Sequence, residues 1–219
     1  MKIAITGHSS GLGNELHDII DLTMPGIETR GYSKSNGWNI AEQEGEKVIA
    51  DILDFDPDVF FNNAYYPAIQ NRILDRLYNE WKDQDKVIIN TGSISGYLAP
   101  IIGDEPDYVR DKKALAEYCI LNSFNYKINN RCRIQCISFG FVDTPLLNLK
   151  KEDATKNMIP VNEAAFLLLD TALDEKPYLV PEMVVNPIQN DDVMLKYYKI
   201  ATKNMLKHVA RSNRDLKSK

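Results

Sequence analysis

The stretch MKIAITGHSSGLGNEL, residues 1–16, decides the fold of this chain. Its apolar, β-branched run KIAIT has the length of a strand and leads directly into Gly7, Gly11 and Gly13, which have the spacing G-x-x-x-G-x-G ahead of a helical pattern. Glycines at such positions permit a tight turn, the close approach of a pyrophosphate and close packing of the helix on the strand. The free N–H groups and the dipole at the start of the helix attract an anion. The stretch therefore predicts a dinucleotide site rather than a chance turn.

Strand-like and helix-like runs alternate along the rest of the chain, which is typical of βαβ units and a parallel sheet. The predicted strands cover 2–6, 27–33, 58–63, 86–92, 133–139 and 178–185. The predicted helices cover 11–23, 40–55, 73–83, 107–128 and 161–174. Several of the strands are apolar throughout, as strands buried on both faces should be. We therefore predict an α/β protein with a Rossmann-like, doubly wound parallel sheet flanked by helices.

The length of 219 residues fits a single domain. We assign 1–190 to a dinucleotide-binding catalytic domain and 191–219 to a basic helical tail of the same domain. The tail mixes lysine and arginine with apolar residues. This pattern predicts an amphipathic helix packed on the body or on a neighbouring subunit, and an anchor for an anionic surface is the alternative.

Charge and composition favour a small-molecule partner. The formal net charge of −5 gives no general reason to bind nucleic acid or an anionic membrane. No apolar stretch approaches the ~20 residues of a membrane span, and the N-terminus starts with a strand rather than a secretory signal, so we expect a cytoplasmic protein. The three cysteines, Cys119, Cys132 and Cys136, lack the spacing of a metal site, so they are expected to be buried thiols without a metal or disulfide.

The end of the second predicted strand decides between the two nicotinamide dinucleotides. An acidic residue there would bind the ribose 2′-hydroxyl of NAD, but the sequence RGYSKSNGW has none. Ser33 and Lys34 can receive a 2′-phosphate as donor and cation, and Arg30 lies nearby. NADP(H) is therefore favoured over NAD(H), with a solvated Lys34 as the alternative reading.

A tyrosine and a lysine lie one helical turn apart in YVRDKKAL. Tyr108 and Lys112, at i and i+4, share a helix face and can address the same ligand. A nearby ammonium stabilises a phenolate and lowers the pKa of the phenol, which makes it a usable proton donor and acceptor. Ser93 follows the predicted strand 86–92, at the sheet edge where open α/β folds bind ligands. The pair alone arises by chance on many helices; after a glycine-rich first loop and a strand-end serine it becomes specific.

With these motifs in this order, the chain resembles the single-domain short-chain dehydrogenase/reductase family over roughly residues 1–185. The resemblance is carried by TGHSSGLG at 6–13, NNAY at 62–65, TGSISG at 91–96, YVRDK at 108–112 and FGFVDTP at 139–145. It departs from the family where Tyr65 replaces the glycine of the NNAG motif and Phe139 replaces a proline.

The resemblance implies a role for each matching position. Tyr108 would be the catalytic acid/base, Ser93 would orient the substrate carbonyl, and Lys112 would lower the pKa of the tyrosine and bind the nicotinamide ribose. Asn71 is the candidate for a fourth catalytic residue, an asparagine of a proton relay, and a helix-surface amide is an equal alternative. The positions assigned to the cofactor are Gly7, Ser9, Ser10, Gly11, Leu12, Gly13, Ser33, Lys34, Asn39, Ile40, Asn63, Ala64, Tyr108, Lys112, Gly140, Val142 and Thr144.

The function expected from this resemblance is hydride transfer between a nicotinamide and a small-molecule carbonyl or alcohol, in a homodimer or homotetramer. The alternative, from a different class, is a sensor or scaffold that keeps the dinucleotide fold without turnover. The irregular NNAY and FGF motifs favour the sensor. The complete set of Ser93, Tyr108 and Lys112 favours the enzyme, since a sensor needs no such set.

Overall fold

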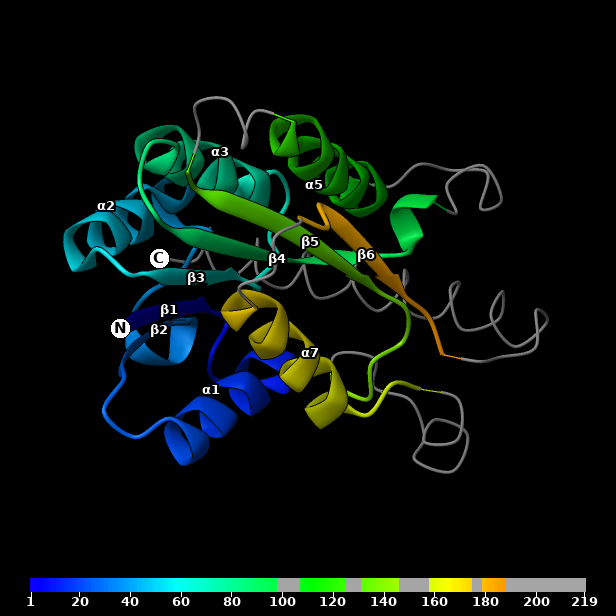
Figure 1. The fold of residues 1–219 in the computed structure, drawn as a ribbon, viewed down its shortest axis with the longest axis horizontal. Coiled ribbons are helices and arrows are strands. Elements are labelled where there is room, and N and C mark those ends of the chain that lie inside the picture. Colours follow the sequence, from blue (N-terminus) through cyan, green and yellow to red (C-terminus); the bar gives the residue numbers. More distant parts are fainter. Residues whose placement is uncertain (98–106, 125–130, 146–157, 175–178, 188–219) are drawn as a thin grey trace, which may run out of the picture.

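The computed structural model describes residues 1–97, 107–124, 131–145, 158–174 and 179–187. These residues build a six-stranded parallel sheet with the order β2-β1-β3-β4-β5-β6 (Figure 1). The strands are β1 (Lys2–Thr6), β2 (Glu28–Tyr32), β3 (Val59–Asn62), β4 (Val87–Ser93), β5 (Arg133–Phe139) and β6 (Glu182–Val185). The predicted parallel α/β sheet is confirmed.

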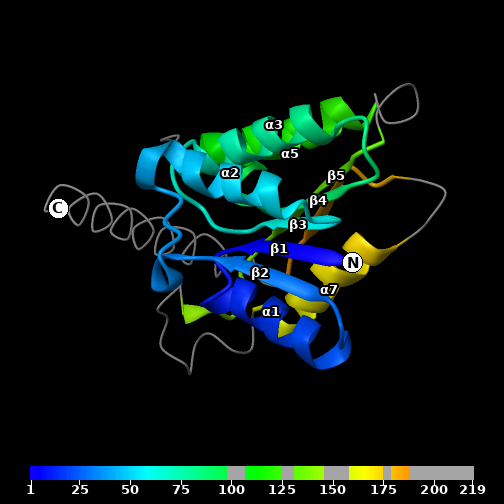
Figure 2. The same ribbon diagram turned by 90° about the vertical axis from the view of Figure 1, so that its left-hand side faces the viewer.

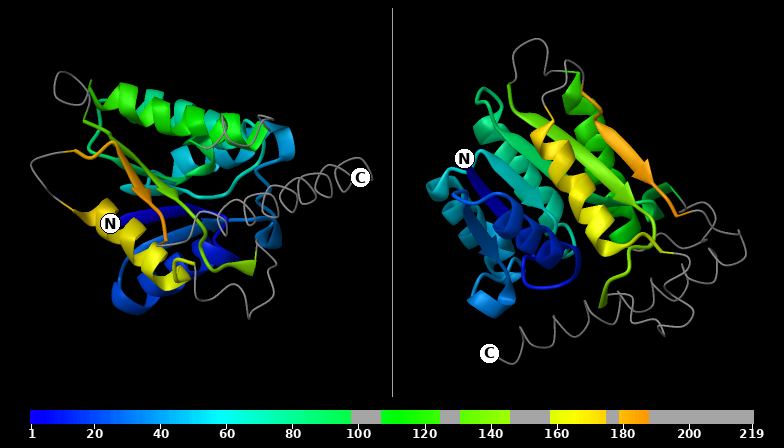
Figure 3. Two further views of the ribbon diagram at one scale, coloured as in Figure 1. Left: turned by 90° about the vertical axis from the view of Figure 1, so that its right-hand side faces the viewer. Right: turned by 60° about the horizontal axis from the view of Figure 1, so that its bottom comes forward.

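Helices cover both faces of this sheet, so the predicted doubly wound arrangement is also confirmed (Figures 1 and 2). One face carries α1 (Gly11–Thr23) and α7 (Val161–Leu173), which lie side by side over the strands (Figure 3). The other face carries α2 (Glu46–Phe55), α3 (Ile69–Trp81) and α5 (Asp107–Ser123). Two short 3-10 helices, η1 (Lys34–Asn36) and η2 (Glu42–Gly45), lie between β2 and α2.

The hydrophobic core has two parts, one on each side of the sheet, because successive side chains of a strand point to opposite faces. Ile3 and Ile5 of β1 pack with α1 and α7, whereas Ala4 between them belongs to the cluster formed with α2, α3 and α5. All three side chains are fully buried. Strands in this environment must be apolar on both sides, which explains the uninterrupted hydrophobic runs in the sequence.

The position of β1 between β2 and β3 makes its carboxyl end a switch point. The chain leaves β1 toward β2 and later returns to the other side of β1 as β3. Connections on the two sides diverge above such a point, and open α/β sheets bind their ligands there. The glycine-rich loop at residues 7–13 and the segment after Asn62 both begin at this edge.

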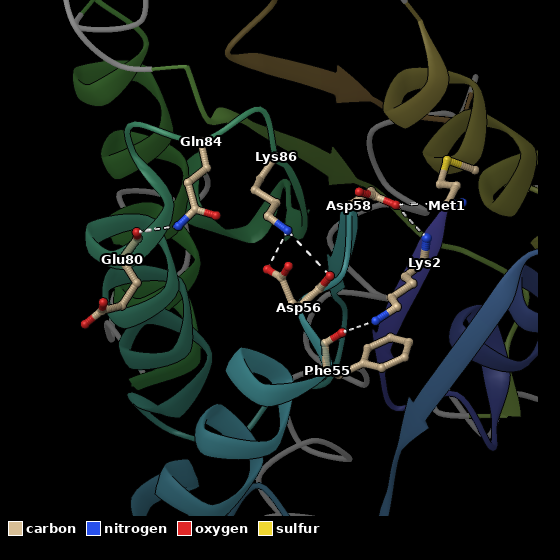
Figure 4. A network of polar contacts seen from close by, with 8 residues as sticks. All are labelled: Met1, Lys2, Phe55, Asp56, Asp58, Glu80, Gln84 and Lys86. Carbon is tan, nitrogen blue, oxygen red and sulfur yellow. Dashed lines mark hydrogen bonds and ion pairs between the residues drawn. The ribbon is translucent and has the colours of Figure 1, made fainter.

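The opposite edge of the sheet, at the amino ends of the strands, is closed by polar contacts (Figure 4). The Lys2 ammonium donates to the carbonyl of Phe55 at 3.0 Å, and the Lys2 backbone N–H donates to the Asp58 carboxylate at 2.7 Å. The buried Lys86 ammonium pairs with Asp56 at 2.6 Å. These contacts connect β1, β3 and β4 at their amino ends. The carboxyl ends of the strands remain available for a ligand.

Three elements start four or more residues away from the predicted position. The predicted helix 40–55 is split, because the chain takes a positive φ of 80° at Gly45, and α2 begins only at Glu46. α3 begins at Ile69, four residues before the predicted start at 73, after a left-handed turn at Ala68. β6 begins at Glu182, later than the predicted start at 178.

The predicted tail at 191–219 lies outside the described residues, so its helix and the division at residue 190 stay predictions. Within the described residues, no helix is both long and apolar enough to cross a membrane.

Candidate active site

The glycine-rich loop forms the turn that the sequence predicts for a phosphate. Gly7 takes a φ of +76°, which residues other than glycine rarely adopt. Its N–H donates to the carbonyl of Tyr32 on β2 at 2.7 Å. Gly13 has ordinary dihedrals, but a Cβ there would overlap the Gly7 carbonyl and come within 2.7 Å of Asn63 Nδ2. The first glycine therefore permits the turn and the third permits close packing of α1 on it.

The amino end of α1 remains open to an anion. Ser10 is the N-cap residue, its side chain makes no capping hydrogen bond, and the first turn carries no acidic residue. Ser9 and Ser10 are exposed beside this end, whereas the Leu12 side chain is buried in the core and leaves only its backbone for a ligand. An uncapped helix start with free N–H groups fits a pyrophosphate.

Side-chain hydrogen bonds connect the carboxyl ends of β1, β3 and β4 next to this loop. The Thr6 hydroxyl accepts the N–H groups of Asn63 at 2.9 Å and Ala64 at 3.0 Å. The Asn63 side chain donates to the Thr6 carbonyl at 3.1 Å and accepts from the Thr91 hydroxyl at 3.1 Å. Asn63 and Ala64, the two predicted cofactor residues of the NNAY motif, therefore connect these strand ends. Both polar atoms of the Asn63 side chain are used in these hydrogen bonds.

Ser93 and Tyr108 come together at the end of β4. Ser93 is the last residue of β4, and its hydroxyl accepts a hydrogen bond from Ser95 at 2.9 Å. Both serine side chains lie close to the Tyr108 phenol, which is in the first turn of α5, and both favour its charged form. Ser95 was not predicted, although the second serine of TGSISG was the available signal. The phenol and the two hydroxyls form one polar group.

The pKa of the Tyr108 phenol is shifted in the direction opposite to the expected one. Burial raises its pKa, and the Ser93 and Ser95 side chains act against that rise without overcoming it. The Lys112 ammonium, expected to lower this pKa, lies 5.6 Å from the centre of the Tyr108 ring and is held by other partners. The expectation of a lowered pKa for Tyr108 is therefore wrong.

Lys112 is buried between α5 and the sheet, with 3% of its surface exposed. Its ammonium donates to Gln70 Oε1 at 2.7 Å and to the Thr91 carbonyl at 2.6 Å. Burial lowers the pKa of Lys112 to about 8, against the opposing influence of Cys136 and Asp111. The sequence predicted the shared face with Tyr108 but not the partner Gln70, because a glutamine at the start of a helix carries no recognised motif.

Tyr65, which replaces the family glycine, packs against the predicted catalytic tyrosine. Its ring lies edge-on to Tyr108 with 4.8 Å between ring centroids, and its hydroxyl donates to the Asp111 carboxylate at 3.1 Å. The same carboxylate accepts the N–H of Ala68 at 2.7 Å, where the backbone takes a left-handed φ of 61°. Asp111 thus holds a strained loop that keeps the Tyr65 ring on Tyr108.

Asn71, the candidate fourth catalytic residue, ties α3 to α5. Its side-chain amide donates to the main-chain carbonyl of Asp111 at 2.9 Å, one residue before Lys112. No contact joins Asn71 to Ser93 or Tyr108 within the described residues. Its assignment to a proton relay stays a prediction.

The residues expected to receive a 2′-phosphate are differently engaged. Arg30 binds Asp51 at 3.1 Å and lies over the Phe55 ring, on the α2 side of the sheet. Its position therefore does not support the preference for NADP(H). The N–H and hydroxyl of Ser33 both donate to Asn36 Oδ1 within η1, at 3.0 and 3.3 Å. Lys34 is exposed at the start of η1.

Two further predicted cofactor residues, Asn39 and Ile40, lie between η1 and η2. Asn39 makes local contacts with Ala41 and Glu42 at the start of η2, and Ile40 is 8% exposed in the core. Their contact with an adenine stays a prediction.

The segment after β5 turns toward the glycine-rich loop. The N–H of Gly140 donates to the Val185 carbonyl at 2.7 Å, and Val142 forms a bridge with Ile159. A Cβ on Gly11 would lie 3.4 Å from the Cβ of Thr144, so this threonine borders the loop. These positions place the end of the FGFVDTP segment beside the predicted pyrophosphate site.

No protein-family model and no curated protein sequence matches this chain. Solved structures match it over most of its length. The 3-alpha-hydroxysteroid dehydrogenase from Pseudomonas sp. B-0831, complexed with NADH, is 18% identical with a TM-score of 0.67, over 84% of this chain and 94% of that chain. A 4-hydroxyisoleucine dehydrogenase complexed with NADH is 16% identical with a TM-score of 0.64, over 85% and 97%. A short chain dehydrogenase from Burkholderia cenocepacia J2315 in complex with NADP is 13% identical with a TM-score of 0.62, over 84% and 95%.

This chain has the fold of the short-chain dehydrogenase/reductases. The resemblance to this family that the motifs carry therefore extends to the fold of the whole described sheet. The residues present also fit a nicotinamide dinucleotide, because the open start of α1 follows β1, and the Ser93, Tyr108 and Lys112 group lies beside β4, two strands further along the carboxyl ends of the same sheet.

Proposed function

We propose that the chain is an NAD(P)(H)-dependent oxidoreductase that interconverts a carbonyl and an alcohol. The observation that carries the proposal is the polar group of Ser93, Ser95 and Tyr108, with Lys112 one turn after Tyr108 on α5. Four side chains with these chemistries, which come from the end of β4, the turn after it and α5, suit proton transfer to an oxygen that gains charge.

Each residue has a role that follows from its chemistry. The glycine-rich loop and the start of α1 would hold the pyrophosphate, and the bound dinucleotide would supply the hydride. In the reductive direction the Tyr108 phenol gives its proton to the substrate oxygen. The Ser93 hydroxyl donates a hydrogen bond to the same oxygen, and the positive charge of Lys112 favours the phenolate that remains.

We further propose that NADP(H) is preferred over NAD(H). The end of β2 carries no acidic side chain to repel a 2′-phosphate, and the exposed Lys34 follows it directly. Because Ser33 is engaged by Asn36, the preference rests on the lysine and on the missing acid.

The second candidate function is a dinucleotide sensor without turnover. Two observations favour it: the raised pKa of Tyr108, and the Tyr65 ring that packs against this phenol where the family has a glycine. Both functions share the bound dinucleotide and differ only in chemistry.

Titrating the purified protein with NADPH and NADH by fluorescence, followed by a panel of ketones, aldehydes and alcohols, separates the candidates. The enzyme predicts tight dinucleotide binding and cofactor turnover with at least one substrate class. Tyr108→Phe is expected to bind the dinucleotide as wild type does and to lose turnover by about 100-fold or more. Binding without turnover across the panel would support the sensor, and no binding would refute both.

A further inference from the structure

Gln70 occupies a central place behind the proposed active site. It lies in the first turn of α3 and only 2% of its surface is exposed. Its side-chain amide nitrogen donates to the carbonyl of Asn62 at 2.7 Å and to the carbonyl of Thr91 at 3.2 Å. Its side-chain oxygen accepts from the Lys112 ammonium at 2.7 Å. One carboxamide thus joins β3, β4 and α5.

The orientation of this carboxamide follows from the chemistry of its partners. The carbonyl oxygens of Asn62 and Thr91 can only accept, and an ammonium can only donate. Rotating the amide by 180° would place its nitrogen against Lys112 and its oxygen against two carbonyls, so all three contacts would become repulsive. The side-chain oxygen of Gln70 must therefore face Lys112.

The same contacts define what Lys112 can still do. An ammonium has three N–H donors, and the contacts with Gln70 and the Thr91 carbonyl use two of them. Both acceptors are uncharged, so they hold the ammonium without neutralising it. The positive charge remains 5.6 Å from the centre of the Tyr108 ring.

We propose that Gln70 is a positioning residue that fixes the Lys112 ammonium by a direct, uncharged side-chain contact. The inference rests on the proposed function, because the value of an unneutralised charge beside Tyr108 lies in proton transfer. A carboxylate at position 70 would hold the lysine equally firmly but would cancel its charge. An apolar residue would leave the ammonium without this acceptor.

Few other charged or titratable groups face Lys112 in the described residues. Asp111, its neighbour on α5, and Cys136 on β5 both act to raise its pKa, and the rings of Tyr65 and Tyr108 lie 5.4 and 5.6 Å from its nitrogen. The Asp111 carboxylate is engaged by Tyr65 and Ala68. A charge placed at Gln70 would therefore be the nearest one to the ammonium.

Titration of Lys112 by NMR tests the contact without any catalysis. In protein labelled with ¹³Cε-lysine, the signal that disappears in Lys112→Met identifies this residue. Gln70→Glu is expected to raise the pKa of Lys112 by about one to three units from its value of about 8, because an opposite charge within a few ångströms favours the charged form. Gln70→Met, close in volume but without an acceptor for the ammonium, is expected to lower the pKa below the wild-type value. The matched control is Asn79→Asp, the same amide-to-carboxylate change on the exposed side of α3, which should leave the Lys112 titration unchanged.

An unchanged Lys112 titration in a folded Gln70→Glu protein would overturn the proposal. If neither Gln70 variant folds, the wild-type protein still decides: a nuclear Overhauser contact between the Lys112 side chain and the Gln70 carboxamide is expected, and its absence would refute the contact. Turnover then tests the role separately. Gln70→Glu should reduce kcat about tenfold or more while dinucleotide affinity at pH 7 changes little. A shifted titration with unchanged kcat would confirm the contact and refute the positioning role, whereas a wild-type protein without turnover would refute the proposed function alone.

Discussion

Burial of the Lys112 ammonium gives the stability of the fold a defined dependence on pH. The pKa of Lys112 is lowered from 10.5 to about 8 in the folded protein, because the charged form loses its water when the side chain is buried. The unfolded chain therefore binds more protons than the folded chain between these two values. The cost of the buried charge is fully present below pH 8 and is relieved as the pH rises toward 10.5, so stability increases over this range.

The magnitude follows from the shift. A difference of about 2.5 units corresponds to about 3 kcal/mol at completion, with about 1.4 kcal/mol gained by pH 9 and about 2.5 kcal/mol by pH 10. Lys112→Met removes the titrating group. The free energy of unfolding of the wild type should therefore rise relative to this variant by these amounts as the pH increases from 7 to 10.

Urea denaturation followed by circular dichroism, in the absence of any dinucleotide, measures both proteins at pH 7, 8, 9 and 10. The loss of the hydrogen bonds to Gln70 and Thr91 in Lys112→Met adds an offset that does not depend on pH, so the change with pH isolates the titration. Lys113→Met removes an exposed ammonium from the same helix and controls for net charge. A wild-type minus Lys112→Met difference that stays within 0.5 kcal/mol across this range would refute the reasoning.

Three further predictions concern the glycine-rich start of α1, the start of η1 and the turn before α3. Gly13→Ala should weaken dinucleotide binding by at least about tenfold in a fluorescence titration, since its Cβ would overlap the Gly7 carbonyl, and unchanged affinity would contradict the role of this close approach. Lys34→Glu should weaken NADPH binding about tenfold while NADH binding changes little, and equal losses for the two would show that the lysine does not contact the 2′-phosphate. Ala68→Gly should raise the unfolding free energy or leave it level within about 1 kcal/mol, because the left-handed φ of 61° costs alanine more than glycine; a clear loss in urea denaturation would contradict the assigned strain.

The fold could be predicted because local signals and burial agree along the chain. The run KIAIT becomes β1, which is buried from Ile3 to Thr6, and the glycines after it make the predicted turn. The boundaries of the helices were harder to predict from the sequence. The periodicity of residues 40–55 reads as one helix, but the backbone at Gly45 turns before α2 starts, and such a turn leaves no mark in the apolar pattern.

The site could be predicted only where spacing carries the information. The i, i+4 relation of Tyr108 and Lys112 and the strand-end position of Ser93 are visible in one dimension, and the structure brings Ser93 and Tyr108 into contact. Gln70 and Asp111 could not be found in this way, because their importance comes from contacts with residues about 40 positions away. The pKa of Tyr108 was also beyond the sequence, since burial of a phenol is a property of packing.

Deuterium transfer tests the central claim most directly. The wild-type protein, supplied with NADPH deuterated at C4 of the nicotinamide, on each face in turn, and with a carbonyl substrate that the panel identifies, is expected to give an alcohol that carries one deuterium from one of the two faces. Tyr108→Phe should bind the same dinucleotide and form essentially no labelled alcohol. An alcohol without deuterium, or labelled alcohol formed equally fast without the phenol, would contradict the account.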